Sequence, residues 1–362
     1  MGIKEAIIVE ARAALDEQRE DGSMPSGHNG PYFHVETPLR NTGHWLVTWS
    51  RVWQWTQDPV FLCAAERAMG YILLPEHRPF GENWFHRDQV GRDRCNGLIG
   101  AAWTIEALCV AHQVLGSTKA LKDAVSVARS HRFNEKVGLW NRLEVDGEIL
   151  SMDQTFNHQL WFAASIARLV GAGAIEFQHP LDVFMDHLNQ WFAVDRDGLI
   201  RHRIVIYARD RLFVPGTLPH WLFMRLKAIK SRRKPVDARM RDIGYHAFNL
   251  HAFALLKQFL PDHSFWQSGD FIRSLEFSGG RTFEKETEAG NPYAYPYNPV
   301  GFEMALASWV FSPVDKVAGP ERWMDKQWNL LTSGGRDRYG NVAADPVTAR
   351  ARIYEACEFL NS

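Results

Sequence analysis

The sequence predicts an all-α protein folded as an (α/α)6 toroid, in which a ring of outer helices encloses a ring of inner helices. Apolar residues recur at helical spacing along most of the 362 residues, and few segments alternate as paired strands do. The expected helices come in pairs, and the first member of each pair is apolar on nearly all sides, as buried helices are. The pairs recur at a period of roughly 50–60 residues, which indicates a repeat architecture. We therefore expect one domain over residues 1–362.

The first helix is expected over residues 3–19 and ends at Asp21-Gly22. Five helix pairs follow, each divided by glycine or proline, which end helices. In chain order the pairs cover 40–56 with 58–73, 96–115 with 118–131, 155–171 with 179–193, 243–259 with 263–275, and 299–311 with 320–332. A last helix over 346–360 has no partner downstream, so we expect it to pair with residues 3–19 and close a sixth hairpin.

The inner helices are the first members of the pairs, as in GLIGAAWTIEALCVA, whereas second members such as KALKDAVSVARS are amphipathic. Their starts are marked by Asn41, Asn96, Asn157, Asn249 and Asn298. The longest gap between these asparagines locates an insertion within 203–240. Turn glycines before alternating residues predict loops or short β-ribbons over one end of the ring, at 137–149, 197–204 and 338–342.

The insertion places an apolar stretch before a cluster of basic residues: Arg225, Lys227, Lys230, Arg232, Arg233 and Lys234. Residues 218–234 therefore fit a helix that makes a peripheral contact with a membrane surface. A solvated helix and loop beside the mouth of the ring is the ordinary interpretation of the same pattern.

Composition excludes several classes of protein. With 41 basic and 42 acidic side chains the formal charge is −1, which gives no long-range field to attract nucleic acid. Four cysteines without a CxxC pair disfavour a zinc module or a disulfide scaffold, and no phosphate-binding glycine loop occurs, so we expect neither a metal nor a cofactor. The amphipathic start and the lack of an apolar run of about 20 residues predict a soluble, cytoplasmic protein without a transmembrane segment.

In such a ring the first turns of the inner helices converge on a central funnel. The chain has 14 tryptophans, and aromatic side chains in a polar funnel suit a saccharide, whose ring faces stack on them. Trp45 and Trp161 are candidates for this stacking. A place in the core explains them equally well, because large aromatics supply much of any helical core.

Polar residues open the inner helix expected at 155–171. Asp153 lies just before it, and Asn157 and His158 fall in its first turn. A helix cap favourable by about 1 kcal/mol explains Asp153 by itself. Asn157 and His158, however, carry polar groups into an otherwise apolar helix, which costs energy unless they are satisfied. A polar cluster that faces the funnel is the simpler account.

Asp93 repeats this arrangement before the helix expected at 96–115. Because one hairpin separates Asp93 from Asp153, we expect the two carboxylates at neighbouring inner-helix starts. Carboxylates brought together acquire divided pKa values, which leaves one protonated as an acid and the other charged. Two exposed caps would also explain the pair.

Three more side chains are candidates for substrate binding. Arg201 and His202 lie on a turn, where they either hold an anionic substrate or are solvated. Glu303 in GFEMALA either faces the funnel or bonds to a neighbouring arginine.

The run from Asp93 to about Val342 resembles the six-hairpin glycosidases, particularly the unsaturated glucuronyl and rhamnogalacturonyl hydrolases of families 88 and 105. The likeness lies in DRCNGLIGAAW, MDQTFNHQLWFAASIA, the DGLIRH turn, RDIGYHAFNLHAFALLKQFLPDH and AGNPYAYPYNPVGFEMALASWVF. It implies that an Asp before an inner helix protonates the C4=C5 bond of an unsaturated uronic acid, after which water adds at C5. Asp153 is the matching position, and Asp93 resembles the second carboxylate. The Asn-His pair after Asp153 departs from those hydrolases.

That pair is similar to elements of the α/α-toroid uronate lyases, such as the alginate lyases of family 5. This weaker resemblance rests on Asn157-His158 with Trp161, and on Tyr245-His246 preceded by Arg239 and Arg241. It implies that an Asn and an Arg neutralise the uronate carboxylate while His158 and Tyr245 move protons. An amide and a guanidinium can stabilise the enolate-like charge that such a reaction develops.

We therefore expect a carbohydrate-active, glycoside hydrolase-like enzyme for oligosaccharides that contain a uronic acid. Asp153 is the expected general acid/base and Asp93 its partner. The alternative enzyme is a uronate lyase or sugar epimerase in which His158 and Tyr245 carry protons. A third hypothesis is a toroid that binds a glycan or a protein without catalysis, since a fold does not dictate an activity.

Overall fold

The computed structural model describes residues 2–204, 235–288, 290–311, 319–332 and 343–361. Most of the expected insertion, including the basic stretch 218–234, lies outside the described residues. The ribbon expected at 338–342 lies outside them as well.

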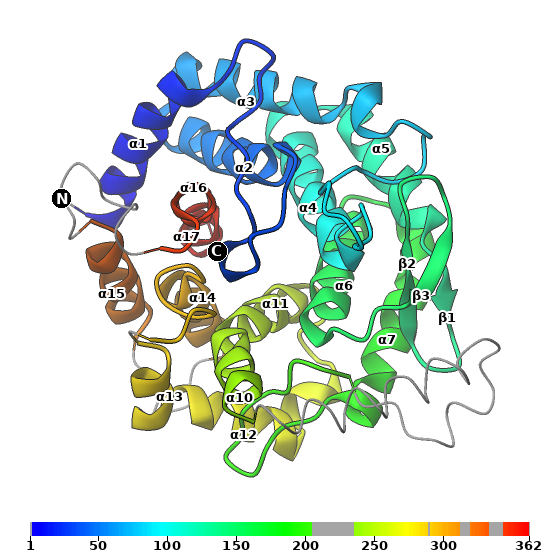
Figure 1. Cartoon of the computed structure of the whole chain (residues 1–362), viewed down its shortest axis with the longest axis vertical. Helices are drawn as coiled ribbons and strands as arrows, with labels where there is room; N and C mark the ends of the chain where they lie inside the picture. The colour runs from blue at the N-terminus through cyan, green and yellow to red at the C-terminus, as the bar shows by residue number, and fades with distance from the viewer. Residues whose placement is uncertain (1, 205–234, 289, 312–318, 333–342, 362) are drawn as a thin grey trace.

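The inner ring consists of six helical segments in chain order. They are α2 (Leu39–Thr56), α4 (Gly97–Leu115), α6 (Phe156–Gly171), α11 (His246–Phe259), α14 (Val300–Val310), and the short pair α16 (Pro346–Ala351) and α17 (Tyr354–Leu360). Each segment contacts the next, and α17 contacts both α14 and α2, so the ring closes (Figure 1). The predicted (α/α)6 toroid is confirmed.

Amphipathic helices surround this ring (Figure 1). They are α1 (Ile3–Ala13) with the 3-10 turn η1 (Ala14–Glu17), α3 (Pro59–Ile72), α5 (Thr118–Ser130), α7 (Gln178–Trp191), α12 (Gly269–Ser278) with α13 (Arg281–Glu286), and α15 (Pro320–Thr332). The sixth hairpin joins the two ends of the chain as expected, because Arg350 of α16 forms ion pairs with Glu10 of α1 and Glu17 of η1.

Three predicted helices have different boundaries in the structure. The helix expected over 243–259 begins later, as α11 at His246, and residues 243–244 end a separate helix, α10 (Pro235–Gly244). At that junction the backbone of Tyr293 approaches Gly244 too closely for any side chain there. The helix expected over 263–275 starts as the 3-10 turn η5 (Ser264–Gln267), and α12 begins only after the Ser268 cap. The helix expected over 346–360 breaks at Arg352, whose guanidinium bonds to Glu303 of α14.

A three-stranded antiparallel sheet lies beside the ring. It contains β1 (Phe133–Asn134), β2 (Leu139–Leu143) and β3 (Ile149–Met152), in that order. The expected ribbon over 137–149 is therefore present and extends to Met152. The stretch 197–204 makes only isolated bridges, Val194 with Ile200 and Thr155 with Arg203. The ribbon leads the chain through Asp153 into the start of α6, and the later stretch 197–204 returns to pair with Thr155 beside it.

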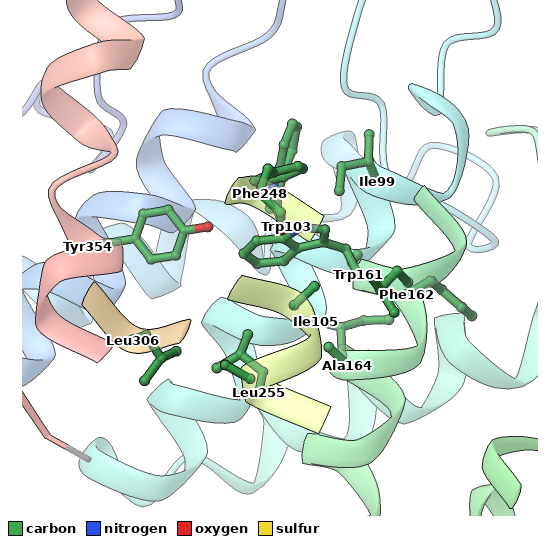
Figure 2. Close-up of a cluster of buried hydrophobic side chains, with 14 of the residues drawn as sticks. Ile99, Trp103, Ile105, Trp161, Phe162, Ala164, Phe248, Leu255, Leu306 and Tyr354 are labelled. Atoms are coloured by element: carbon green, nitrogen blue, oxygen red, sulfur yellow. Dashed lines mark hydrogen bonds between the residues drawn. The ribbon is translucent and has the colours of Figure 1, made fainter. Parts of the chain in front are cut away.

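The core contains aromatic side chains from several inner helices. Figure 2 shows Trp103 of α4, Trp161 of α6 and Phe248 of α11 in one apolar cluster. The α4 helix is long and apolar enough to cross a membrane, with a mean hydropathy of 1.5, but most of it is buried. It lies in the ring between α2 and α6, which explains why it is apolar on all sides.

Candidate active site

The N-terminal ends of the inner helices surround a cavity of about 640 Å³. The positive ends of the helix dipoles meet there, and such ends favour anions. Among the residues that the structure describes, seven arginines and three histidines line the cavity, against two aspartates, Asp93 and Asp153. The structure brings together five of the predicted site residues, since the cavity is lined by Asp93, Asp153, Asn157, His158 and Tyr245.

Asp153 and His158 form a hydrogen-bonded pair in the wall of this cavity. The imidazole donates from Nδ1 to Oδ2 of Asp153 at 2.7 Å, a direction assigned from the carboxylate partner. Backbone amides of Leu98 and Thr155 also donate to the carboxylate, at 3.2 and 3.0 Å. The Asp153 side chain is buried, whereas that of His158 is 23% exposed. This arrangement leaves Nε2 of His158 as the nitrogen available for chemistry.

Asp153 is ionised at neutral pH, which differs from its expected role as a general acid. Burial by itself would raise the pKa of this carboxyl, but His158 and the Thr155 amide outweigh it and hold the pKa well below the ordinary range. A carboxylate in this state orients and supports the imidazole rather than supplying a proton.

Gly97 makes the Asp153-His158 pair sterically possible. Its φ of 64° lies in the left-handed region, and a Cβ there would lie 2.6 Å from Oδ2 of Asp153 and 2.7 Å from Nδ1 of His158. The first residue of α4 therefore approaches both partners as only glycine can.

Asp93 is held in an ion-pair cluster of its own. Arg87 donates to Oδ1 at 2.8 Å, Arg142 donates to Oδ2 at 2.7 Å, and the amide of Gly97 donates to Oδ1 at 2.8 Å. Burial opposes ionisation, but the two guanidiniums and the amide lower the pKa of Asp93. The expectation that one of the two aspartates stays protonated is wrong, because each has cationic or N–H partners that favour its charged form.

Tyr245 and His202 lie on another part of the cavity wall. The hydroxyls of Tyr245 and Tyr32 are 3.1 Å apart and hydrogen-bonded, and burial raises the pKa of Tyr245 well above its ordinary value. The His202 ring stacks on that of Tyr245 at 4.8 Å between centroids. Burial lowers the pKa of His202 well below its ordinary value, so the imidazole is neutral. Its buried Nδ1 has no hydrogen-bond partner among the described residues.

Arginines supply most of the charge in the cavity. Arg241 donates to Asp237 at 3.2 Å and stacks on the ring of Tyr293. Arg203 and Arg92 form no ion pair with any residue that the structure describes. Burial lowers the pKa of Arg203, and Arg241 and Arg142 add to this effect, while the Asp153 carboxylate opposes it. An anionic ligand would supply what this wall lacks.

The floor is aromatic and cationic. The guanidinium of Arg40 lies 4.1 Å from the ring centroid of Trp103, and that of Arg352 lies 5.1 Å from the ring of Phe248. Burial would lower the pKa of Arg40, but Tyr297 and Glu36 raise it above the ordinary value, so the cation persists. Flat rings beside fixed cations form a surface that can receive one face of a sugar ring.

Six of the expected substrate-binding residues do not line the cavity. Trp45 and Trp161 are buried in the core, Trp45 beside Trp49 and Trp161 stacked on Phe248 at 4.5 Å. The core interpretation is therefore the correct one for both tryptophans. Trp161 supports the floor from below by donating to the carbonyl of Phe248 at 3.1 Å.

The other four residues have partners elsewhere. Arg201 pairs with Asp195, and Arg239 pairs with Asp197 and Glu286, all on the exterior. His246 is buried, accepts from the amide of Ile200 and donates to the carbonyl of Ser274. Glu303 is buried and accepts from Arg352 at 2.6 Å, so it acts on the cavity only through that arginine.

Several lining residues were not found by sequence reasoning: Tyr32, His34, Arg40, Arg87, Arg142, Arg203, Tyr293 and Arg352. Most lie on loops or on the ribbon, where charged side chains are solvated by default. The sequence predicts the ribbon and the turn around 197–204 over one end of the ring. The arginines in these two segments were the sequence signal that could have identified them as cavity residues. Among the residues that the structure describes, no group of three or more His, Cys, Asp or Glu side chains could hold a metal ion.

No protein-family model matches the chain. Archaeal glycosylation protein Q of Haloferax volcanii is 38% identical to it, over 98% of this chain and 96% of that protein. Cellobiose 2-epimerase from Spirochaeta thermophila has a similar structure, with a TM-score of 0.63 at 15% identity, over 99% of this chain and 97% of that one. An unsaturated glucuronyl hydrolase specific for heparin gives a TM-score of 0.61 at 13% identity, over 99% and 95%. The fold is thus that of the toroid glycosidases and related sugar enzymes.

Proposed function

Because the chain belongs to the family of archaeal glycosylation protein Q, we propose that it is a carbohydrate-active enzyme that works on a saccharide used in glycosylation. The reaction we propose is proton transfer at the carbon next to the carboxylate of a uronic acid, leading to epimerisation. The observation that carries this proposal is the 2.7 Å pair of Asp153 and His158 in the wall of a cavity rich in arginine.

His158 is the proposed general base. With Nδ1 donating to Asp153, its Nε2 carries the lone pair that accepts a proton from carbon. The ionised carboxylate then stabilises the imidazolium that forms, as the buried aspartate does in a Ser-His-Asp triad. Neither Asp153 nor Asp93 holds a proton to donate at neutral pH, which is why we prefer the imidazole as the proton carrier.

The arginines of the cavity are proposed to bind the uronate carboxylate. Removing the proton beside a carboxylate moves negative charge onto the carboxylate oxygens, and fixed cations that meet this charge lower the barrier. Arg203 and Arg241 are the first candidates, since Arg203 has no ion-pair partner in the described chain. The Asn157 amide lines the same cavity.

Tyr245 is proposed to return the proton from the other face. Its raised pKa keeps the phenol protonated at neutral pH, and the Tyr32 hydroxyl beside it can donate to the phenolate that transfer would leave. Proton loss to His158 and proton gain from Tyr245 balance on the substrate. One turnover leaves His158 protonated and Tyr245 as the phenolate, and proton exchange with water restores both groups. Inversion of a carbon centre requires an acid and a base on opposite faces, and the two groups line the cavity from the starts of different inner helices, α6 and α11.

The test is a set of hexuronic acids and short uronate-containing oligosaccharides, with products separated by anion-exchange chromatography. We expect one uronate to convert into its C5 epimer with all glycosidic bonds intact, and His158→Ala to abolish the conversion. An ultraviolet-absorbing unsaturated product would indicate a lyase instead. Consumption of an unsaturated uronide that survives in His158→Ala but not in Asp153→Asn would establish the hydrolase.

A further inference from the structure

Two neighbouring loops beside the mouth of the cavity expose apolar side chains. Phe33 is 69% exposed, Val35 is 60% exposed and Val90 is 95% exposed. The loops are held together, since the amide of Val35 donates to Gln89 at 3.2 Å and the amide of Asp88 donates to the carbonyl of Val35 at 2.9 Å. We call Phe33, Val35 and Val90 the rim patch.

The rim patch is fixed in place by the same loops that build the cavity. Tyr32 and His34 flank Phe33 and line the cavity, and the ring of Phe33 stacks on that of His28 at 4.9 Å. Glu36 forms a β-bridge with Arg87 at the base of the two loops. These contacts hold the two loops in place, so the rim patch stays on the surface beside the cavity.

Positive charge lies next to the rim patch. Arg92 follows Val90 by two residues, lines the cavity mouth and has no ion pair within the described chain. The carboxylate nearest to Val90 in sequence is that of Asp88. The next one, Asp93, is already neutralised by its ion pairs with two arginines. Apolar side chains at loop tips next to an unpaired arginine match the chemistry of an anionic lipid surface.

We propose that the rim patch docks the enzyme on a bilayer containing anionic lipid, with the cavity mouth turned toward the membrane. Three loop-tip side chains are too few for a stable protein interface, which buries about 1,000 Å² or more. They suffice for shallow insertion beside acidic headgroups, since insertion strength depends on apolar area together with charge attraction. The enzyme then acts at the membrane surface. This inference goes beyond the proposed reaction and does not depend on it.

The experiment is co-sedimentation of the full chain with phosphatidylcholine vesicles that contain or lack phosphatidylglycerol. We expect binding only to the vesicles with phosphatidylglycerol. Phe33→Asn with Val90→Ser should weaken it roughly tenfold, since each removes an exposed apolar side chain that insertion would bury in lipid. The matched control is Ile175→Ser, which removes an apolar side chain that is 77% exposed beyond the other end of α6. That control should bind as the unaltered chain does.

Two outcomes would overturn the proposal. One is binding to anionic vesicles that the rim-patch substitutions leave unchanged while the variants keep the parent melting temperature. The other is a change in oligomeric state on rim-patch substitution with no vesicle binding by the parent, which would make the patch a protein interface. Turnover of a water-soluble saccharide should persist in the rim-patch variants, so failure of docking and failure of the proposed reaction give different results.

Discussion

The Nδ1 atom of His158 lies 2.7 Å from the Oδ2 atom of Asp153, and the first residue of α4, Gly97, leaves just enough room for the two to meet. Three segments thus form one unit: the end of the β-ribbon supplies the carboxylate, α6 the imidazole and α4 the space.

Asp153→Asn should remove most of the activity and leave substrate binding nearly intact. The amide keeps the shape of the carboxylate but cannot stabilise an imidazolium, so kcat should fall by about 10²- to 10⁴-fold while KM changes little. Turnover kinetics measure the split. Asp58→Asn, at the exposed cap of α3, serves as the control and should retain parent kinetics. An Asp153→Asn variant with full kcat would contradict the assignment.

Gly97→Ala should abolish activity and destabilise the fold. The added methyl group would meet both Asp153 and His158 at less than 3 Å, in addition to the strain of a φ of 64°. Gly116→Ala is the matched control, because Gly116 has a φ of 71° with nothing within 4 Å of its Cβ position. The control should lose about 1 kcal/mol and keep its activity. Equal behaviour of the two variants in denaturant unfolding and turnover would show that the clash does not matter.

The contribution of the buried histidines to stability should fall as the pH falls from 6.5 toward 4. Burial lowers the pKa of His131 and His246 to about 4, and that of His86 and His251 to about 3, from an ordinary value of 6.5. The unfolded chain therefore binds protons in this range that the folded chain does not. Between pH 6.5 and the folded pKa, each such histidine lowers the free energy of unfolding by about 1.4 kcal/mol for every unit by which the pH falls. Above pH 6.5 its stabilising contribution is present in full.

Urea unfolding across this pH range measures the slope. His131→Gln should reduce it by about the share of one histidine. His179→Gln should not, because the side chain of His179 is 70% exposed. Burial raises the pKa of Glu106 to about 8 and that of Asp242 to about 6, which gives slopes of the opposite sign, so the comparison between variants carries the test. A His131→Gln variant with the same slope as the unaltered chain would contradict the neutral state of His131.

Arg168 should be one of the residues on which the closed ring depends. It pairs with Glu358 of α17 at 2.7 Å and contacts Glu106 of α4 at 3.2 Å, so it joins three inner helices. Burial raises the pKa of Glu106 to about 8, whereas Arg168 and Arg51 outweigh burial and lower that of Glu358 to about 2, so Glu358 is the charged partner. Arg168→Met leaves the Glu358 carboxylate undercompensated and should cost about 3–5 kcal/mol. Glu106→Gln by itself should cost much less.

The surface control for this variant is Arg129→Met. Arg129 pairs with Glu176 at 2.8 Å, but its side chain is 66% exposed, so the loss should be below about 1 kcal/mol. Chemical denaturation compares the two. A loss as small for Arg168→Met as for Arg129→Met would show that the buried network does not hold the ring.

The ring could be predicted from sequence because the burial of a helix determines how many of its sides are apolar. The α4 and α14 segments are apolar on all sides, which only an inner position explains, and α5 is amphipathic as an outer helix must be. The same pattern made the polar side chains of Asn157 and His158 stand out in an otherwise apolar α6. These exceptions proved to face the cavity.

The chemistry of the site could not be predicted in the same way. A tryptophan on a helix buried on every side has no sequence signal for the direction it faces, so Trp161 could not be distinguished from Trp103, which lines the cavity. The charge state of Asp153 depends on a through-space contact with His158 that spacing does not specify. Arg142 and Arg203 lie on the ribbon and a turn, where arginine is common and ordinarily solvated.

Incubation with a hexuronic acid substrate in deuterium oxide tests the central claim most directly. Nuclear magnetic resonance and mass spectrometry can follow deuterium entering the carbon beside the carboxylate. We predict that the parent chain incorporates deuterium, that Asp153→Asn incorporates much less, and that His158→Ala incorporates no deuterium. Turnover without any solvent deuterium at that carbon, or incorporation that persists without His158, would contradict the account.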